Sequence, residues 1–270
     1  MPLSVNKNAS HERANAVWVP RPRNDVTVTA SQYDSKGRKK NPEGNKVIMH
    51  VKLISITQST IRNKEDTRNL TPEEHIVYCA RVSNPSNQLN LESADKLLGY
   101  CIKHGHWSIF EQVSMGVEIK TSRAIAQQII RHKSFSFQEF SQRYSTAQEI
   151  EEVELRAQAL KNRQSSTDLI TDSDLLARIS EHFACCKTLY DELIASNVAK
   201  ESARFVMPLA TSTTLYMTGS VRSWIHYLNL RDNEHTQKEH QEIAKSVKEI
   251  FVEHFPSISL ALNYNSNNGK

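Results

Sequence analysis

One short stretch of the chain, residues 131–144, concentrates side chains that can bind an anion. It holds three cations, one carboxylate and several serine hydroxyls. An arginine can grip a phosphate or a uracil-like edge through two hydrogen bonds, whereas a lysine supplies a point charge. A solvated basic loop would not need the phenylalanines at positions 135, 137 and 140. Cations placed among aromatic residues that need burial therefore predict a site for an anionic ligand.

The glycine content excludes two common phosphate-binding loops. The chain has 270 residues but only 7 glycines, which are never clustered. It therefore lacks both the G-x-G-x-x-G pattern of a dinucleotide-binding unit and the G-x-x-x-x-G-K-[ST] loop. Any bound nucleotide must be held by side chains or helix ends.

The positive charge is confined to the N-terminal part of the chain. The net charge is +4, but residues 1–46 carry +5 and the remainder carries −1. Residues 1–46 are polar and proline-rich, which predicts a flexible basic N-terminal extension, with a targeting or partner-binding arm as the alternative. The charge of the body argues against an extended nucleic-acid-binding surface.

Cysteine usage and hydropathy indicate a cytoplasmic protein. No cysteines form a C-x-x-C pair, as expected in a reducing compartment. No apolar run approaches the ~18 residues of a transmembrane helix, and the N-terminus lacks the apolar segment of a secretory signal. Helical patterns surround all four cysteines and predict that they belong to the core, at positions Cys79, Cys101, Cys185 and Cys186.

The elements that must position residues 131–144 begin with strands and short helices. Residues 47–56 and 113–121 are predicted to be strands because they are β-branched or alternate between apolar and polar residues. Helices are expected from Thr71 to about Val82 and from Leu91 to His104, ending at Gly105. Ser122 is expected to cap a helix that ends near Arg131 and carries Gln128 and Arg131 on one face.

The second half of the chain is predicted to be mostly helical. Residues 133–150 are expected to form a loop, and residues 151–171 irregular structure. Long helical patterns follow at about 173–196, 200–206, 219–231 and 236–254. In the pattern at 219–231, Arg222, His226 and Asn229 share one face, whereas Trp224 and Leu228 belong to a core stripe. The chain is thus predicted to be helix-rich α/β, of the α+β type, with a small sheet.

The stretch 131–144 resembles the signature R-H-R-x-x-S-x-x-x-x-S-x-R of the flavin-dependent thymidylate synthases (ThyX). It matches at Arg131, His132, Ser136, Ser141 and Arg143, with Lys133 in place of the third basic residue. The resemblance covers about residues 47–255 and leaves out residues 1–46. Other segments resemble the family in the same order: 79–83, 104–111, 155–164, 202–208 and 228–235.

The resemblance implies an enzyme that converts dUMP to dTMP. The methylene group would come from methylenetetrahydrofolate and the hydride from FAD reduced by NADPH, with tetrahydrofolate released. It further implies a ThyX-like antiparallel sheet flanked by long helices, a catalytic domain at 47–270, and a homotetramer with active sites between subunits.

The resemblance also assigns roles to individual residues. Arg231 is expected to be catalytic, because its equivalent contacts the uracil ring and can stabilise negative charge developing there. His106 matches a histidine linked to catalysis through folate placement. The positions implied for dUMP are Gln128, Ser141, Arg143, Arg204 and Arg231. Those implied for FAD are Ser108, Arg131, His132, Lys133, Glu139, His226 and His235.

Four positions depart from the family pattern. Lys133 keeps the charge but loses the bidentate fork of arginine, which predicts weaker FAD binding. Gln138 stands where many members have asparagine. Ser220 and His226 stand where some members have asparagines that contact FAD, although His226 can still donate a hydrogen bond.

Other functions agree less well with these residues. A module for single-stranded nucleic acid could use the basic extension and the aromatic stretch, but the body has no matching positive charge, so no nucleic-acid partner is expected. No metal is expected, since H-E-x-x-H and cysteines at zinc spacing are missing. Ser141 lacks the G-x-S-x-G surroundings of an activated nucleophile. A silent relative with a scaffolding role is disfavoured because the arginine and serine positions are filled.

Overall fold

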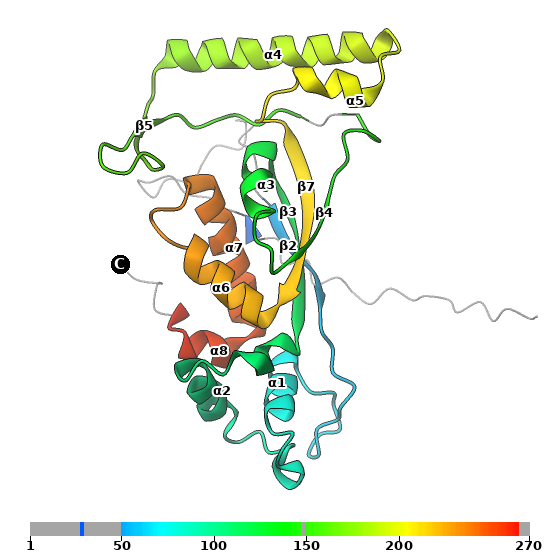
Figure 1. Ribbon diagram of the computed structural model, residues 1–270, viewed down its shortest axis with the longest axis vertical. Helices are drawn as coiled ribbons and strands as arrows, with labels where there is room; N and C mark the ends of the chain where they lie inside the picture. The colour runs from blue at the N-terminus through cyan, green and yellow to red at the C-terminus, as the bar shows by residue number, and fades with distance from the viewer. Residues whose placement is uncertain (1–27, 30–49, 147–148, 265–270) are drawn as a thin grey trace, which may run out of the picture.

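A five-stranded antiparallel sheet forms the centre of the described chain (Figure 1). The structure is a computed structural model that describes residues 28–29, 50–146 and 149–264. An antiparallel sheet flanked by helices is the predicted fold class, which is therefore confirmed. In spatial order the strands are β1 (Val28–Thr29), β2 (His50–Ile56), β3 (Ser114–Ser122), β7 (Ser212–Ser220) and β4 (Ser136–Glu139).

The two longest strands, β3 and β7, pair along their whole length, and each leads directly into a helix. The side chain of Ser122 accepts a hydrogen bond from the backbone of Ile125 and caps α3 (Arg123–Ile129) as predicted. Ser220 caps α6 (Val221–Arg231) in the same way. Because β3 and β7 are antiparallel, the two helices start from opposite ends of the sheet.

The helices before β3 agree with their sequence signals to within about three residues. Helix α1 (Pro72–Ala80) starts with a capping box in which Thr71 and Glu74 exchange hydrogen bonds. Helix α2 (Ala94–Lys103) is followed by Gly105, whose φ of 70° lies in the left-handed region that glycine adopts without strain. The 3₁₀ helices η1 (Pro85–Asn87) and η2 (Trp107–Glu111) complete this part.

Helices α6 and α7 (Lys238–His254) lie over one face of the sheet, and α8 (Pro256–Ala261) returns against α2 (Figure 1). Trp224 and Leu228 are almost completely buried in this layer, so their predicted place in the core is confirmed. Burying one such large apolar side chain stabilises the fold by about 1.5–3 kcal/mol. Packing against the sheet therefore fixes the position of α6.

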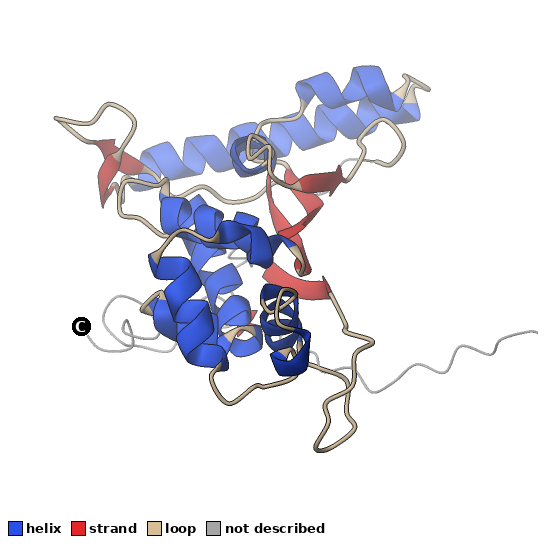
Figure 2. Ribbon diagram, turned by 60° about the horizontal axis from the view of Figure 1, so that its bottom comes forward, coloured by secondary structure: helices blue, strands red, loops and turns tan. Residues whose placement is uncertain are grey.

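Helix α4 (Ser173–Ala195) lies apart from this core, across one end of the sheet, with α5 (Lys200–Ala203) beside it (Figures 1 and 2). The 3₁₀ helix η3 (Arg204–Val206) follows α5 directly. Of the 23 residues of α4, only Tyr190 is buried, and it packs with Ala203 of α5. Leucines 175, 176 and 189 of α4 are exposed. The arm formed by α4 and α5 thus has apolar surface that the described residues do not cover.

The predicted elements of residues 133–171 were wrong in two places. The region expected to be a loop contains β4, which pairs with β7 and places Phe137 opposite Met217. The region expected to be irregular contains a hairpin of β5 (Arg156–Gln158) and β6 (Ser166–Leu169). Strand β7 and helix α8 were not predicted. The first two residues of the helix expected at 219–231 belong to β7 instead.

The predicted extension, residues 1–46, lies outside the described residues except for Val28–Thr29, which pair with β2. No helix within the described ranges has the length and apolar character needed to cross a membrane. Cys101 is buried but Cys185 is exposed, so the prediction that all four cysteines belong to the core was wrong. Cys185 lies on α4, where Tyr190 is the one buried residue.

Candidate active site

The loop that follows α3 carries the densest group of predicted site residues, and α6 fixes its position. The rings of Phe135 and Trp224 meet edge to face with centroids 4.6 Å apart. Ser223 Oγ donates a hydrogen bond to the backbone oxygen of Ser134 across 3.1 Å. A Cβ at Gly219 would overlap the Phe135 ring, so glycine lets this ring lie close against β7. Contacts with both α6 and β7 therefore fix the loop.

His132 and Arg231 meet at the C-terminal end of α6. Arg231 Nε donates a hydrogen bond to His132 Nε2 across 2.9 Å, so this nitrogen is an acceptor and the imidazole is neutral. Burial, aided by the charge of Arg231, lowers the pKa of His132 to about 4. A neutral histidine thus orients the half-buried guanidinium.

A chain of hydrogen bonds connects Gln128 of α3 with α6 and α7. His240 Nε2 lies 3.1 Å from the hydroxyl of Tyr227, and His240 Nδ1 lies 3.4 Å from Gln128 Oε1. Gln128 Nε2 donates to Gln237 Oε1 across 2.5 Å. The ring of His132 packs on that of Tyr227 with centroids 5.0 Å apart. This contact joins the series of hydrogen bonds to the His132–Arg231 pair. We refer to Gln128, His132 and Arg231 as the Arg231 group.

Arg131 and Lys133 flank His132 and are exposed, without a hydrogen bond or ion pair to any of the described residues. Helix α3 ends at Ile129, so Arg131 lies beyond it. Gln128 and Arg131 therefore do not share one helix as predicted, because a turn in which His132 N donates to the backbone oxygen of Ile129 follows directly after the helix. Two exposed cations on either side of His132, with no partner among the described residues, fit a phosphate-containing ligand.

Arg143 and Arg204 form a second group, centred on Glu201 of α5. Arg143 donates from Nε and Nη2 to Glu201 Oε2 at 3.1 and 3.0 Å. Arg204 Nε donates to the backbone oxygen of Glu201 across 3.2 Å. Ser141, two residues before Arg143, is exposed. We call these residues the Arg143 group; no hydrogen bond, ion pair or ring contact within the described ranges joins it to the Arg231 group.

Ser108 lies on the 3₁₀ helix η2 and His226 on helix α6, and these two elements contact each other. The rings of Trp107 and His226 lie 5.1 Å apart, and Arg222 Nη1 of α6 pairs with Glu111 Oε1 at 3.1 Å. Ser108, His226 and His106 are all exposed. The ring of His106 lies 5.8 Å from that of Tyr100 on α2.

Glu139 and His235 contact neither group in the described part of the chain. Glu139 Oε1 accepts a hydrogen bond from Thr213 Oγ1 at 3.0 Å and pairs with Arg123 Nη1 at 3.5 Å. His235 is exposed, with Glu234 3.8 Å away. Within the described ranges, no three His, Cys, Asp or Glu side chains are grouped so as to hold a metal ion.

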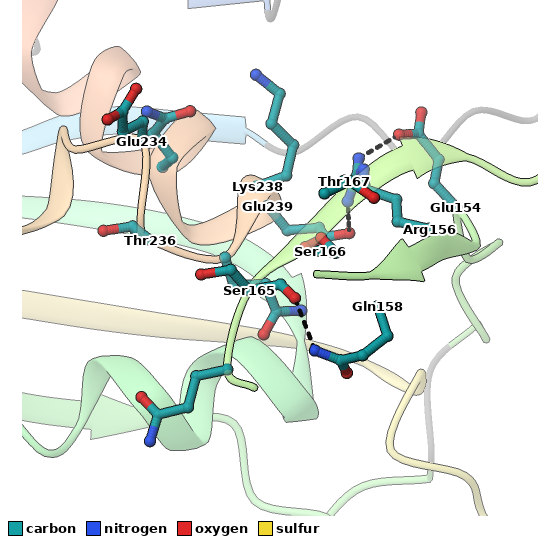
Figure 3. Close-up of a pocket in the computed structure, with 13 residues that line it drawn as sticks. Glu154, Arg156, Gln158, Ser165, Ser166, Thr167, Glu234, Thr236, Lys238 and Glu239 are labelled. Carbon is teal, nitrogen blue, oxygen red and sulfur yellow. Dashed lines mark hydrogen bonds and ion pairs between the residues drawn. The ribbon is translucent and has the colours of Figure 1, made fainter. Parts of the chain in front are cut away.

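A polar cleft of about 350 Å³ separates the β5–β6 hairpin from the first turn of α7 (Figure 3). Arg156 in this cleft donates to Glu239 at 2.9 Å and to Glu154 at 2.5 Å, so two carboxylates neutralise its charge. Gln158 Nε2 donates to the backbone oxygen of Ser165 at 3.0 Å. Gln237, the partner of Gln128, also lines the cleft. Amides and hydroxyls therefore dominate it, rather than unpaired cations.

Comparison with known proteins shows which family the chain belongs to. Residues 67–257 match the family model described as thymidylate synthase complementing protein (Thy1). The chain belongs to the Thy1 family. This Thy1 chain is 51% identical over 219 residues to the flavin-dependent thymidylate synthase of Synechocystis sp., and 47% identical over 220 residues to the probable flavin-dependent thymidylate synthase of Paramecium bursaria Chlorella virus 1. Each match covers 80% of this chain and 100% of the relative.

The fold of this Thy1 chain is similar to the crystal structure of a UMP/dUMP methylase, PolB, from Streptomyces cacaoi bound with 5-Br dUMP. The TM-score is 0.68 with 22% sequence identity, and the likeness covers 81% of this chain and 96% of that chain. The predicted resemblance to flavin-dependent thymidylate synthases is thus confirmed at the level of family and fold.

Sequence reasoning missed several residues that the Thy1 fold brings to these groups. Glu201 pairs with Arg143 across 58 positions of the chain, and His240 reaches Gln128 across 112. Neither spacing falls within one helix or one strand pair, so no local pattern could reveal it. Tyr227 and His240 do give one weak signal, since each is a polar residue at a position of its helix where core residues are expected.

Proposed function

We propose that the chain catalyses the reductive methylation of dUMP to dTMP, with methylenetetrahydrofolate as the carbon donor. FAD, once reduced by NADPH, would supply the hydride, and tetrahydrofolate would be released. The observation that carries this proposal is the alignment of the chain with two flavin-dependent thymidylate synthases over their entire length. The reaction makes the chain a methyltransferase of nucleotide synthesis.

Arg231 is the residue that acts on the pyrimidine in this proposal. Its Nε is engaged by His132, while its Nη1 and Nη2 make no hydrogen bond to the described residues and can meet a ligand. A fixed guanidinium beside the ring would stabilise negative charge as carbon-5 becomes nucleophilic. Because His132 holds the guanidinium in place, little reorganisation would be needed when the charge develops.

The phosphate of dUMP would be held mainly by the Arg143 group. A phosphomonoester carries nearly two negative charges, which suits the paired Arg143 and Arg204. Ser141 adds a hydroxyl, and Gln128 contributes from the Arg231 group. The dUMP site proposed here therefore consists of Gln128, Ser141, Arg143, Arg204 and Arg231.

The residues proposed for FAD fit an anionic dinucleotide. Arg131 and Lys133 are exposed cations with no partner in the described ranges, as a pyrophosphate requires. His132, His226 and Ser108 add hydrogen-bonding groups on the adjoining loop, α6 and η2. Glu139 and His235 complete the proposed set, and His106 is assigned to folate placement. The reaction chemistry comes from the flavin, while these side chains bind and orient it.

We propose a homotetramer whose active sites lie between subunits. Two observations support it: the Arg231 and Arg143 groups make no contact with each other among the described residues, and large apolar side chains lie exposed beside the second group. Tyr144 is 85% exposed and Phe205 is 82% exposed, each next to an arginine of the Arg143 group. Exposed aromatic residues of this kind are typical of interfaces. A second copy could place its Arg143 group opposite the Arg231 group of the first.

The product distribution tests this function. Purified protein incubated with dUMP, methylenetetrahydrofolate, FAD and NADPH should form dTMP and tetrahydrofolate in equal amounts. The protein should be yellow and should bleach when NADPH is added anaerobically. Dihydrofolate as the stoichiometric folate product would contradict the proposed mechanism. A colourless protein that takes up no FAD but is retained on single-stranded DNA would instead indicate a nucleic-acid-binding module.

Residues 47–270 are proposed as the catalytic domain, with residues 1–46 as an extension that catalysis does not need. Deletion of residues 1–46 should leave dTMP formation within about twofold of the full chain, since 80% of this chain spans the whole of two relatives. Deletion of residues 1–26 is the matched control, because it keeps the strand Val28–Thr29 that pairs with β2. Loss of soluble oligomer in the longer deletion alone would show that this strand is needed. The free thiols of the four cysteines agree with the proposed cytoplasmic location.

A further inference from the structure

Two polar side chains, Tyr227 and His240, are buried together in the layer between α6 and α7. Tyr227 is 1% exposed and His240 is 0% exposed. Burying a polar pair in place of an apolar one brings no net gain in stability unless every hydrogen bond is made. The pair therefore calls for an explanation beyond core packing, and its contacts lead directly to Gln128.

The hydroxyl of Tyr227 determines the direction of the hydrogen bonds that connect it through His240 to Gln128. Burial raises the pKa of Tyr227, so its hydroxyl keeps its proton. The only acceptor for this proton within the described residues is His240 Nε2 at 3.1 Å. His240 Nε2 must then be unprotonated. Burial, with the nearby charge of Arg231, lowers the pKa of His240 to about 3, so the ring is neutral and its hydrogen sits on Nδ1.

This tautomer fixes the carboxamide of Gln128. The Nδ1–H of His240 faces Gln128 Oε1 at 3.4 Å, which leaves the NH₂ of Gln128 to donate to Gln237 Oε1 at 2.5 Å. If these hydrogen bonds ran in the opposite direction, both glutamine carboxamides would be flipped. The buried hydroxyl hydrogen of Tyr227 would then have no acceptor among the described residues. An unmade buried hydrogen bond is costly, so the forward direction is the stable one.

We propose that His240 is a positioning residue for dUMP binding, which holds the carboxamide of Gln128 so that it presents an N–H donor to the substrate. The inference rests on the proposed function, in which Gln128 contacts dUMP. A presented N–H can pair with a carbonyl or phosphate oxygen of dUMP but not with the N3–H of its ring. Gln237, whose oxygen accepts the hydrogen bond from Gln128, also lines the cleft beside α7.

A double-mutant cycle on the FAD-loaded enzyme tests this inference, with the Kd for dUMP measured by calorimetry. Gln128→Ala and His240→Leu should each weaken dUMP binding about tenfold, and the double variant should be no weaker than Gln128→Ala alone. Effects that multiply to about a hundredfold would overturn the inference. If Gln128→Ala weakens binding and His240→Leu does not, the inference alone fails. If Gln128→Ala binds dUMP normally, the substrate role of Gln128 fails and this inference with it.

A second pair of variants separates positioning from folding. His240→Leu leaves the Tyr227 hydroxyl buried without a partner and should lower Tm, whereas Tyr227→Phe combined with His240→Leu removes both polar groups and should restore most of it. The restored protein should still bind dUMP about tenfold more weakly, with KM raised and kcat at saturation changed less than threefold. Recovery of dUMP affinity together with Tm would show that His240 only supports packing.

Discussion

Arg231 Nε and His132 Nε2 are joined by a hydrogen bond of 2.9 Å that connects the C-terminal end of α6 to the loop after α3. The histidine accepts this bond only while it is neutral. Its pKa of about 4 keeps it neutral at physiological pH. The bond occupies one nitrogen of the guanidinium and leaves the Nη groups for a ligand. The loop after α3 and the C-terminal end of α6 are thus held in a fixed relation to each other.

Replacing Arg231 with alanine should reduce dTMP formation by at least about 10²–10³-fold, the usual cost of losing one fixed donor at a developing charge. FAD should remain bound, because Arg131 and Lys133 are untouched. Turnover with saturating dUMP and the flavin content of the purified variant, read from its visible absorbance, give the two measurements.

Lys245→Ala is the matched control for Arg231→Ala, since Lys245 is an exposed cation on α7. This control should keep both turnover and flavin at the level of the unmodified protein. Near-normal turnover in Arg231→Ala would remove Arg231 from the catalytic role. Loss of flavin in that variant would show that its main effect is on cofactor binding.

Glu201 occupies the side chain of Arg143, and a phosphate must compete for the same N–H groups. Glu201→Gln should therefore tighten dUMP binding by about two- to fivefold, in line with the small energy of an exposed ion pair. The gain should shrink as salt is raised, because salt screens such pairs. Titration of dUMP at 0.05 and 0.5 M salt, with the exposed Glu181→Gln on α4 as control, measures both effects. Weaker binding in Glu201→Gln would mean that Glu201 orients Arg143 for the phosphate.

Local sequence signals predicted most helices, because helix caps and apolar periodicity act over a few positions of the chain. Thr71, Ser122 and Gly105 each mark a helix end through contacts within three residues. Strand β7 was missed although Thr213, Leu215 and Met217 alternate toward the core and its threonines are β-branched residues that favour strands. The short strand β4 exists only through pairing with β7, so the same omission hid it.

The site could be predicted as a set of residue types but not as a geometry. The signature at 131–143 identified Arg131, His132 and Arg143, yet their partners come from distant parts of the chain. Arg231 bonds to His132 across 99 positions, and Arg143 pairs with Glu201 across 58. Such pairs depend on how α6 and α5 pack in three dimensions, which no local period encodes. For the same reason, the separation of the two arginine groups within one chain could not be predicted.

Gly219→Ala should destabilise the protein by about 1–3 kcal/mol and weaken FAD binding. The added Cβ would overlap the ring of Phe135, which is itself packed on Trp224, so the loop carrying Arg131 must shift. Gly99→Ala is the matched control, because its Cβ would lie 3.8 Å from the nearest heavy atom, Ala261 Cβ. In the interior of α2 this control should gain about 0.5–1 kcal/mol. Denaturant unfolding measures the stability of both variants, and flavin titration measures their affinity for FAD. Equal changes in Gly219→Ala and Gly99→Ala would contradict the packing argument.

Glu151 should make the fold less stable as the pH rises from about 4.5 to 7. Burial raises the pKa of this carboxyl to about 7, partly offset by a hydrogen bond from Ser212 Oγ at 3.3 Å. Between the unfolded pKa of about 4.5 and the folded value, the folded chain keeps a proton that the unfolded chain has released. The free energy of unfolding therefore falls through this window and levels off above it.

Glu151→Gln stays neutral at every pH and removes this dependence. Relative to the unmodified protein, the variant should gain about 2–3 kcal/mol in unfolding free energy between pH 5 and pH 8. Urea unfolding at both pH values measures the change, and contributions from other groups such as His132 cancel in the comparison. Glu152→Gln, an exposed neighbour, should show a change below about 0.5 kcal/mol. A Glu151→Gln variant that follows the unmodified protein at both pH values would mean that this carboxyl is ionised in the fold, with a cation or water paired to it.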